Sequence, residues 1–361
     1  MMARMRLGLP LHSLLSQVLI AFTIEFDNEF EHQVPHRTTD FGSTPGAIRP
    51  PFLLSMVMWV RFLRFIPEEG ISVGALKQAW RANEKEMKNR LTRFSSWWGY
   101  VRIEGKAPDL MIRPTAGGLK ALQVWRGLTA AIERRWRKRI GTEAFDELVG
   151  ALQPVADEVG TGLPGAMPIL GYGLFSRQEG EAGTEAGETS LPALLARTLL
   201  AYAMEFEGDS EVSLAIAANV LRFFEERAEV PIRELPTLAC VSKEAIAMAT
   251  GFLEKRGFAT VKSQARTKFL VLTPEGRGEA GEYAKRVAAI EERWRANAGS
   301  KPVDRLRRAL EKITDDPDSE ESPLRLAVKP YPDGWRAQVP APAGLAHFPM
   351  VLHRGGFPDG S

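Results

Sequence analysis

The chain contains little that points to an oxidising compartment or to a membrane. Its 361 residues include a single cysteine, Cys240, so no disulfide can form within the chain. No stretch is long and apolar enough to span a bilayer. The formal net charge is only +2, which excludes a polycation that binds through total charge alone. These absences predict a cytoplasmic protein with no membrane partner.

Motifs for catalysis and cofactor binding are also scarce. Residues 276–281 satisfy G-x-G-x-x-G, but the sequence after them is helical in pattern through Arg295, so no second parallel strand follows. Asp40-Phe41-Gly42 lacks the lysine strand and catalytic loop of a kinase, and no serine has a G-x-S-x-G setting. Cys240 precedes a helix N-cap, where a buried small residue is expected. We therefore expect no enzyme activity and no cofactor.

The five histidines lie only near the two ends of the chain: His12, His32, His36, His347 and His353. They converge if the C-terminal tail folds back on the insertion 28–51. Pro35 interrupts a helix through His32 and His36, and no cysteine cluster supports a zinc site. We expect no bound metal, with a metal or small-anion sensor as an alternative interpretation.

The chain does contain an internal duplication. Residues 14–26 (LLSQVLIAFTIEF) reappear as residues 194–206 (LLARTLLAYAMEF). Further matches follow in the same order: 63–65 with 221–223, 98–100 with 256–258, Pro114 with Pro274, and 132–137 with 290–295. Each copy has the length of one compact domain, and the 44% apolar composition suffices for two buried cores.

The second copy has the pattern of a helix-turn-helix followed by a β-hairpin. Helical spacing over 212–226 precedes a short helix that opens at 230–235, and Ser242 caps a third helix that runs to Gly257. Residues 258–261 and 268–272 read as strands joined by the polar stretch 262–267. Thr273 and Pro274 then begin a long helix. Two strands with a basic tip after a recognition helix predict a wing.

The first copy repeats this layout. Asn83 and Glu86 form an N-x-x-E capping box, residues 100–103 and 110–112 read as strands, and residues 104–109 form the tip. Long helices follow in both copies.

Three features carry a family resemblance: the Leu253-x-x-x-Gly257-Phe258 junction, the return of the wing into Leu272-Thr273-Pro274-x-Gly276-Arg277, and the Glu-x-Arg-Trp helix. In these features the chain resembles the MarR family of winged-helix regulators. The resemblance covers about 14–159 and 194–313. It implies dimers whose terminal helices pair while two winged domains straddle double-stranded DNA. Here one chain supplies both halves. The insertion 28–51 and the C-terminal tail depart from the family pattern.

The predicted fold is therefore mainly α with small β-wings (α+β). Residues 1–160 form a first MarR-like winged-helix domain with the insertion 28–51, residues 161–192 a linker, and residues 193–314 a second such domain. Residues 315–361 form a Pro-rich tail that is partly packed on the body. The long helices of the two domains pair in an intramolecular pseudo-dimer, so the chain acts as a monomer.

The predicted DNA-binding face carries basic and polar side chains. Met87, Leu91, Phe94 and Trp98 share one helix face, which turns polar donors outward. In the second copy, burial of Ile246, Ala249 and Leu253 turns Glu244, Met248 and Gly251 outward, so this half holds phosphates and the first half reads bases. The candidate DNA-binding residues are Lys85, Lys88, Asn89, Thr92, Arg93, Ser96, Arg102, Lys106, Lys255, Lys262, Arg266 and Lys268.

Glu25 and Glu205 occupy the same place in the two copies, inside otherwise apolar helices. One interpretation is a carboxylate that pairs helices at the edge of the buried face. The other, implied by the resemblance, is a polar group in a pocket for a small aromatic effector.

These patterns predict a sequence-specific DNA-binding transcriptional regulator. A protein-interaction scaffold that uses the winged domains for a partner is the alternative from another class. The metal or small-anion sensor on the terminal histidines is the second.

Overall fold

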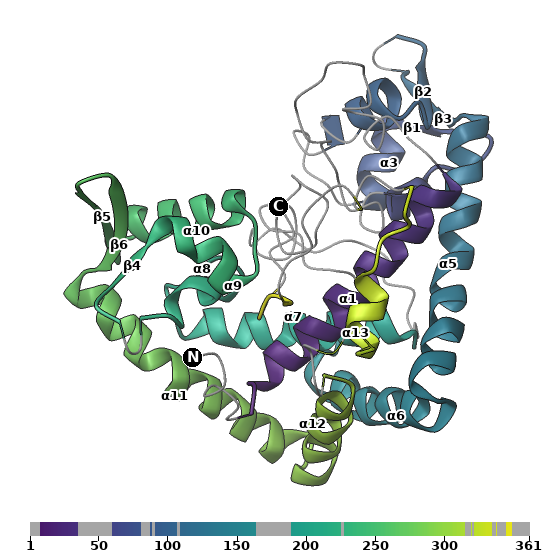
Figure 1. Ribbon diagram of the computed structural model, residues 1–361. Helices are drawn as coiled ribbons and strands as arrows, with labels where there is room; N and C mark the ends of the chain where they lie inside the picture. The colour runs from purple at the N-terminus through teal and green to yellow at the C-terminus, as the bar shows by residue number, and fades with distance from the viewer. Residues whose placement is uncertain are drawn as a thin grey trace.

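The computed structural model describes residues 8–34, 60–80, 87–88, 91–106, 109–163, 189–224, 227–314, 319, 321–333, 337 and 344–348. The protein is mainly helical, with two small antiparallel sheets on opposite sides of the molecule (Figure 1). The prediction of a mainly α protein with small β elements is confirmed. The predicted capping box at Asn83 and Glu86 and most of the predicted linker lie outside the described residues.

The first half runs from one long helix, through a small sheet, to two further long helices. Its elements are α1 (Leu11–Gln33), η1 (Arg61–Phe65), β1 (Ile71–Ser72), α3 (Val73–Trp80), η2 (Arg93–Trp97), β2 (Val101–Glu104), β3 (Met111–Pro114), α5 (Ala116–Ile140) and α6 (Thr142–Val159). Helix α1 ends two residues before Pro35, because proline disfavours helical backbone in the residue before it.

The second half has nearly the same order of elements. They are α7 (Leu191–Gly208), α8 (Leu214–Leu221), β4 (Glu229–Pro231), η3 (Ile232–Glu234), α9 (Leu235–Ala239), α10 (Lys243–Lys255), β5 (Ala259–Gln264), β6 (Thr267–Leu272), α11 (Pro274–Asn297) and α12 (Ser300–Thr314). A short helix of the C-terminal tail, α13 (Pro323–Val328), follows.

The two sheets have the same topology. Each has three antiparallel strands, in the order β1-β3-β2 and β4-β6-β5. The sequence patterns predicted the two hairpin strands of each sheet but not β1 or β4, and residues 229–231 form a strand where we expected the start of a helix. These strands are only two or three residues long, too short for an alternating pattern to identify them.

The hairpin of the second half is longer than expected. Strands β5 and β6 pair as far as Gln264 with Thr267, so the turn consists only of Ala265 and Arg266. The predicted polar connection 262–267 is therefore mostly strand. Ala265 takes a positive φ of 53°, a conformation that this kind of two-residue turn needs and that glycine usually supplies.

The junction from hairpin to long helix is built identically in both halves. Thr115 and Thr273 each cap the following helix by accepting a hydrogen bond at 3.1 Å, from the N–H of Gly118 and Gly276 respectively. A Cβ at Gly276 would lie 1.8 Å from the carbonyl oxygen of Phe258. These glycines therefore permit close contact between helix and strand, and the G-x-G-x-x-G match lies on helix α11 and not in a nucleotide-binding loop.

The buried apolar residues form one continuous core that spans both halves, where the sequence suggested two separate cores. Helices α1 and α7 pack against each other, as do α6 and α12. Every residue from 11 to 31 of α1 is buried, because this helix lies against α5, α7, α12 and α13. Trp136 and Trp294, which match in the two copies, are fully buried in this core.

Contacts between the halves are reciprocal. The carboxylate of Glu291 on α11 accepts a hydrogen bond at 2.8 Å from the N–H of Leu11, the first residue of α1. Glu133 on α5, which matches Glu291 in the duplication, accepts one at 2.7 Å from the N–H of Leu191, the first residue of α7. Helix α6 likewise packs on α7 of the other half, and α12 packs on α1. Matching residues of each half therefore contact matching elements of the other half.

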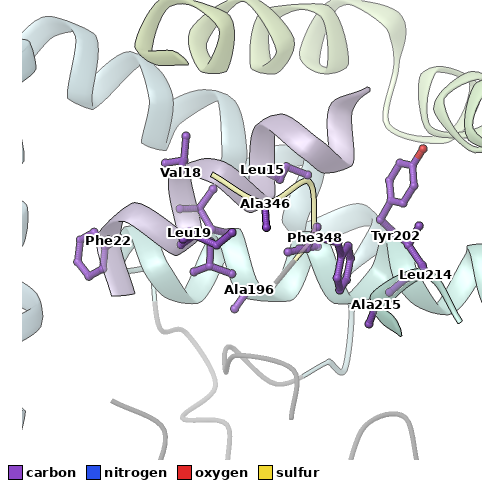
Figure 2. Packing of buried hydrophobic residues seen from close by; sticks show 14 of the residues in the cluster. Leu15, Val18, Leu19, Phe22, Ala196, Tyr202, Leu214, Ala215, Ala346 and Phe348 are labelled. Atoms are coloured by element: carbon purple, nitrogen blue, oxygen red, sulfur yellow. The ribbon is translucent and has the colours of Figure 1, made fainter. Parts of the chain in front are cut away.

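The described residues of the C-terminal tail pack on the body. The ring of Tyr331 stacks on His32 at the end of α1, with ring centroids 4.1 Å apart. Further along, Ala346 and Phe348 are buried in the core, among residues of α1, α7 and α8 (Figure 2). The other large apolar side chains near the C-terminus, Trp335, Met350, Leu352 and Phe357, lie outside the described residues.

Candidate nucleic-acid interface

The helical segment around η2 has the face predicted from its spacing. Met87, Leu91, Phe94 and Trp98 are all buried, which confirms the inward face. Thr92 and Ser96 are exposed on the other side, as is Lys88. Lys85 and Asn89, the two candidate base readers, lie outside the residues whose side chains are described.

Arg93, a candidate phosphate contact, packs against its own helix. It is half-buried, and its guanidinium lies over the ring of Trp97, 4.7 Å from the ring centroid. This cation–π contact leaves the side chain less accessible than that of the exposed Lys88.

The β2–β3 hairpin carries cations that one carboxylate partly neutralises. Glu104 on β2 pairs with Arg102, with an N–O distance of 2.6 Å, and with Arg113 of β3, at 3.2 Å. All three side chains are more than one third exposed, so water screens these ion pairs and each is weak. Lys106 is exposed at the tip. Two arginines that share one carboxylate leave less positive charge here than their number suggests.

The β5–β6 hairpin differs in its charge. Lys262, Arg266 and Lys268 are exposed, and within the described part of the chain no carboxylate lies within 4.0 Å of any of them. Lys255 is exposed at the end of α10, the helix that precedes the hairpin. Three unpaired cations on one rigid hairpin form a surface that can hold the phosphates of a polyanion.

Helix α10 has few donors on its outer face. Ile246, Ala249 and Leu253 are buried as predicted, and Glu244 and Gly251 are exposed. Met248, which we expected to face outward, is half-buried against the core. An acid and a glycine offer no donor pattern to a base edge, so the useful cations of this half are on the hairpin and at Lys255.

Glu25 and Glu205 join helices within each half. Glu25 accepts hydrogen bonds from Trp136 Nε1 at 2.8 Å and from both terminal nitrogens of Arg139 at 2.9 Å. Glu205 accepts from Trp294 Nε1 at 2.6 Å and from Arg293 at 3.2 Å. The tryptophan donors occupy matching positions in the two copies. Both carboxylates are thus engaged by their own half, which favours the helix-pairing interpretation over an effector pocket.

Two of the terminal histidines, His12 of α1 and His347 of the tail, come together where α1 packs on the second half. His347 Nε2 lies 2.9 Å from a terminal nitrogen of Arg222, and the hydroxyl of Tyr283 lies 3.1 Å from His12 Nε2. Burial, and then the nearby Arg222 charge, lower the pKa of His12 to about 3; the same causes, with His12, hold the pKa of His347 well below its usual value. Both imidazoles are therefore neutral at pH 7.

The neutral histidines explain how a buried arginine is accommodated. Burial lowers the pKa of Arg222 to about 10, and His347 accepts its hydrogen bond as a neutral acceptor. Over the described residues, no group of three or more His, Cys, Asp or Glu side chains is placed to hold a metal ion. His36 and His353 lie outside those residues.

The sequence patterns missed Asn219 and Arg222 of the second half. Asn219 donates to the carbonyl of Phe348 at 2.8 Å and accepts from the N–H of His347 at 3.1 Å. An asparagine in an otherwise apolar helix was the available signal. Cys240, expected to be buried, is half-exposed in a left-handed conformation with a φ of 55° at the end of α9.

Comparisons with known proteins return no relative. No family model matches the chain, and neither a curated protein nor a solved structure matches it significantly. Over its described residues, no helix combines the length and the apolar character that crossing a membrane requires.

Proposed function

We propose that this chain is a sequence-specific DNA-binding transcriptional regulator. In this proposal two winged helix-turn-helix units of MarR-like type form an intramolecular pseudo-dimer. The observation that carries it is the β5–β6 hairpin, whose Lys262, Arg266 and Lys268 are exposed without a nearby carboxylate, directly after helix α10 and beside a third strand. A helix followed by a cationic hairpin is suited to the groove and backbone of double-stranded DNA.

The repeated topology supports two such units. Both halves have a three-stranded antiparallel sheet with the same strand order, and both hairpins lead into a long helix through a threonine cap. Figure 1 shows the two hairpins at the far ends of the molecule, with α6 and α12 together at its base. This arrangement is suited to two contacts on one duplex.

The reciprocal interface supports pairing of the halves within one chain. Helix α6 carries only acidic charges, whereas α12 is mostly basic, and Lys312 of α12 lies 3.9 Å from Glu147 of α6. Two identical halves would place like charges together. The difference favours the unlike halves of one chain as partners, and so favours a monomer that acts as a pseudo-dimer.

The two units have unequal tasks in this proposal. The second unit, with a poor donor set on α10 and three unpaired cations on its hairpin, holds phosphates. The first unit reads bases through the outer face of its recognition helix, which carries Lys85, Asn89, Thr92 and Ser96. Lys88 and Arg93 flank this face and contact DNA phosphates. No effector is assigned to Glu25 or Glu205, because both carboxylates are engaged by tryptophan and arginine donors.

The direct test is binding to duplex fragments of the source genome across a range of salt concentrations. The variant Lys262→Gln/Arg266→Gln/Lys268→Gln should weaken binding to all sequences and reduce the log–log salt slope by roughly 0.9 for each lost phosphate contact. The matched control is Lys301→Gln/Arg305→Gln/Arg308→Gln, which removes three exposed cations from α12, away from both hairpins. No retention of DNA at low salt would reject this function and favour a protein-interaction scaffold.

Sequence preference is tested separately. Asn89→Ala should relax the preference for a selected site and cost about 1–3 kcal/mol if the amide pairs bidentately with a base. The selected site should be asymmetric, with one defined half and one permissive half. A perfect palindrome, with equal losses from both recognition helices, would contradict the unequal roles.

A further inference from the structure

The C-terminal segment 344–348 lies between α1 of the first half and α7 and α8 of the second half. Phe348 is fully buried and Ala346 is almost so, and Figure 2 shows both among labelled residues of α1, α7 and α8. The segment thus touches one helix of the first half and two of the second. Three helices from two halves meet on one short piece of the tail.

Directional contacts fix the position of the segment. Asn219 is fully buried on α8 and bonds the tail backbone on both sides, accepting from the N–H of His347 and donating to the carbonyl of Phe348. Gln17 of α1 donates to the carbonyl of Leu345 at 3.4 Å. Arg222, next to the end of α8, donates to His347. Gln17, Asn219 and Arg222 therefore form a site, here called the seat, that binds this short segment with the ring of Phe348 fully buried.

The sequence of the first copy matches the residues of this seat only in part. Arg222 has a counterpart at Arg64 in the duplication, but the position that matches Asn219 is Arg61. The amide that binds the tail backbone is absent from the first copy. The tail therefore distinguishes two halves that otherwise share their topology.

We propose that residues 344–348 act as an intramolecular strap, which fastens helix α8 of the second unit to α1 and α7 and so fixes the spacing of the two hairpins. The fastening role of the strap is independent of the proposed function, and only its effect on DNA binding rests on that function. A fixed spacing removes the entropy cost of aligning two units on one duplex. Release of the strap therefore frees α8 and weakens binding to sites that need both units.

The single cysteine allows a direct test in the full-length protein. A Cβ added at Gly344 would lie 3.3 Å from Cys240 Sγ, close to the separation that a disulfide requires. Gly344→Cys should therefore form an intramolecular disulfide with Cys240 under mild oxidation, measured by loss of free thiols and by mass. The control Gly344→Cys/Cys240→Ser should form none. Failure of the pair to oxidise within the monomer would overturn the seated position of the tail.

The opposite change releases the strap. Phe348→Asp places a charge in a fully buried slot and should raise amide exchange in α8, while Leu326→Asp, at an exposed position of the tail, should not. Binding to a two-unit site should weaken roughly fivefold or more, and the oxidised Gly344→Cys variant should bind at least as well as the wild type. Unchanged exchange in α8, or unchanged affinity with raised exchange, would overturn the strap.

The outcomes separate the two proposals. If the disulfide forms and α8 exchange rises in Phe348→Asp, but no variant binds DNA, the fastening role of the tail stands and the DNA-binding function fails. Should Phe348→Asp not fold, the disulfide variant still decides the question. Gly344 and Cys240 are both half-exposed, and the oxidised and reduced forms compare the same protein with and without a covalent link to the tail.

Discussion

Glu133 accepts a hydrogen bond at 2.7 Å from the backbone N–H of Leu191, so a side chain of the first half caps the first helix of the second half. Glu291 does the same for Leu11 in the opposite direction. Neither α1 nor α7 has a side-chain cap from its own N-cap residue. Negative charge at a helix N-terminus is also favoured by the helix dipole. Each half therefore supplies the N-terminal capping group for the first helix of the other half.

These caps should contribute to stability. Glu133→Gln is expected to lower the free energy of unfolding by about 0.5–1.5 kcal/mol, because a neutral amide is a weaker cap and adds no charge to the dipole. Glu291→Gln should cost more, since Glu291 also pairs with Arg307 at 2.6 Å. Urea titrations measure both. Glu292→Gln, at an exposed position on the same helix, is the control. Equal stability of all three variants would contradict the capping role.

The helix–strand junctions predict a sharp difference among glycines. Gly276→Ala should destabilise the protein by roughly 3 kcal/mol or more, because its Cβ would overlap the Phe258 carbonyl. Gly118→Ala should do the same in the first half, where the overlap is with the Tyr100 carbonyl at 2.1 Å. Gly278→Ala has open space around it and should stabilise by about 0.5–1 kcal/mol. Thermal and urea unfolding would decide. Tolerance of Gly276→Ala would show that helix α11 lies further from the sheet.

The turn of the β5–β6 hairpin stores strain at Ala265. Ala265→Gly should raise the stability of the protein by about 0.5–1 kcal/mol, because glycine adopts a positive φ without the steric cost that alanine bears. The control Ala288→Gly, at an exposed position of α11, should lower stability by a similar amount. A loss of stability in Ala265→Gly would contradict the observed turn.

Acid should destabilise the protein through its buried histidines. The folded protein holds His12 neutral down to a pH of about 3, whereas the unfolded chain takes up the proton near pH 6.5. Above pH 6.5, His12 is neutral in both the folded and the unfolded state, so its lowered pKa does not change the stability. As the pH drops from 6.5 towards 3, the unfolded chain binds the proton and the free energy of unfolding falls. The slope is up to about 1.4 kcal/mol per pH unit for each such histidine, and His347 acts in the same direction.

The measurement is urea unfolding at pH 7.5, 6.0 and 5.0 (conditions chosen to bracket the histidine range). His12→Gln should flatten the dependence, since glutamine does not titrate and its amide can either donate to or accept from the hydroxyl of Tyr283. An unchanged slope in His12→Gln would show that other groups dominate the acid response.

Local signals in the sequence were sufficient to predict much of the architecture. Ser242 and Thr273 accept the capping hydrogen bonds expected of them, and helix α1 stops before Pro35. Met87, Leu91, Phe94 and Trp98 are buried on one face as their spacing predicted. Caps, proline boundaries and helical spacing act within a few residues, so they can be read without knowing the fold. Strands β1 and β4 were missed because two or three residues carry no usable period.

The candidate sites depended far more on tertiary structure. From the sequence, Arg102 was a candidate DNA-binding residue. Only the folded hairpin shows that Glu104 forms ion pairs with both Arg102 and Arg113. Glu25 and Glu205 were recognised as a matched pair, but their partners lie on helices more than 80 positions away, at Trp136 and Trp294. Because an ion pair or hydrogen bond depends on a separation of about 3 Å in space, charge and spacing along the chain do not determine it.

The sequence by itself therefore determined the duplication, the order of helices and hairpins, and which helix faces are apolar, since these follow from local propensity and periodicity. Only the tertiary structure decided that Glu133 and Glu291 cap helices of the opposite half, that both halves share one core, and that Asn219 holds residues 347 and 348 of the tail. These relationships join segments far apart in the chain, and each forms only when the apolar faces of α1, α7, α6 and α12 bury one another.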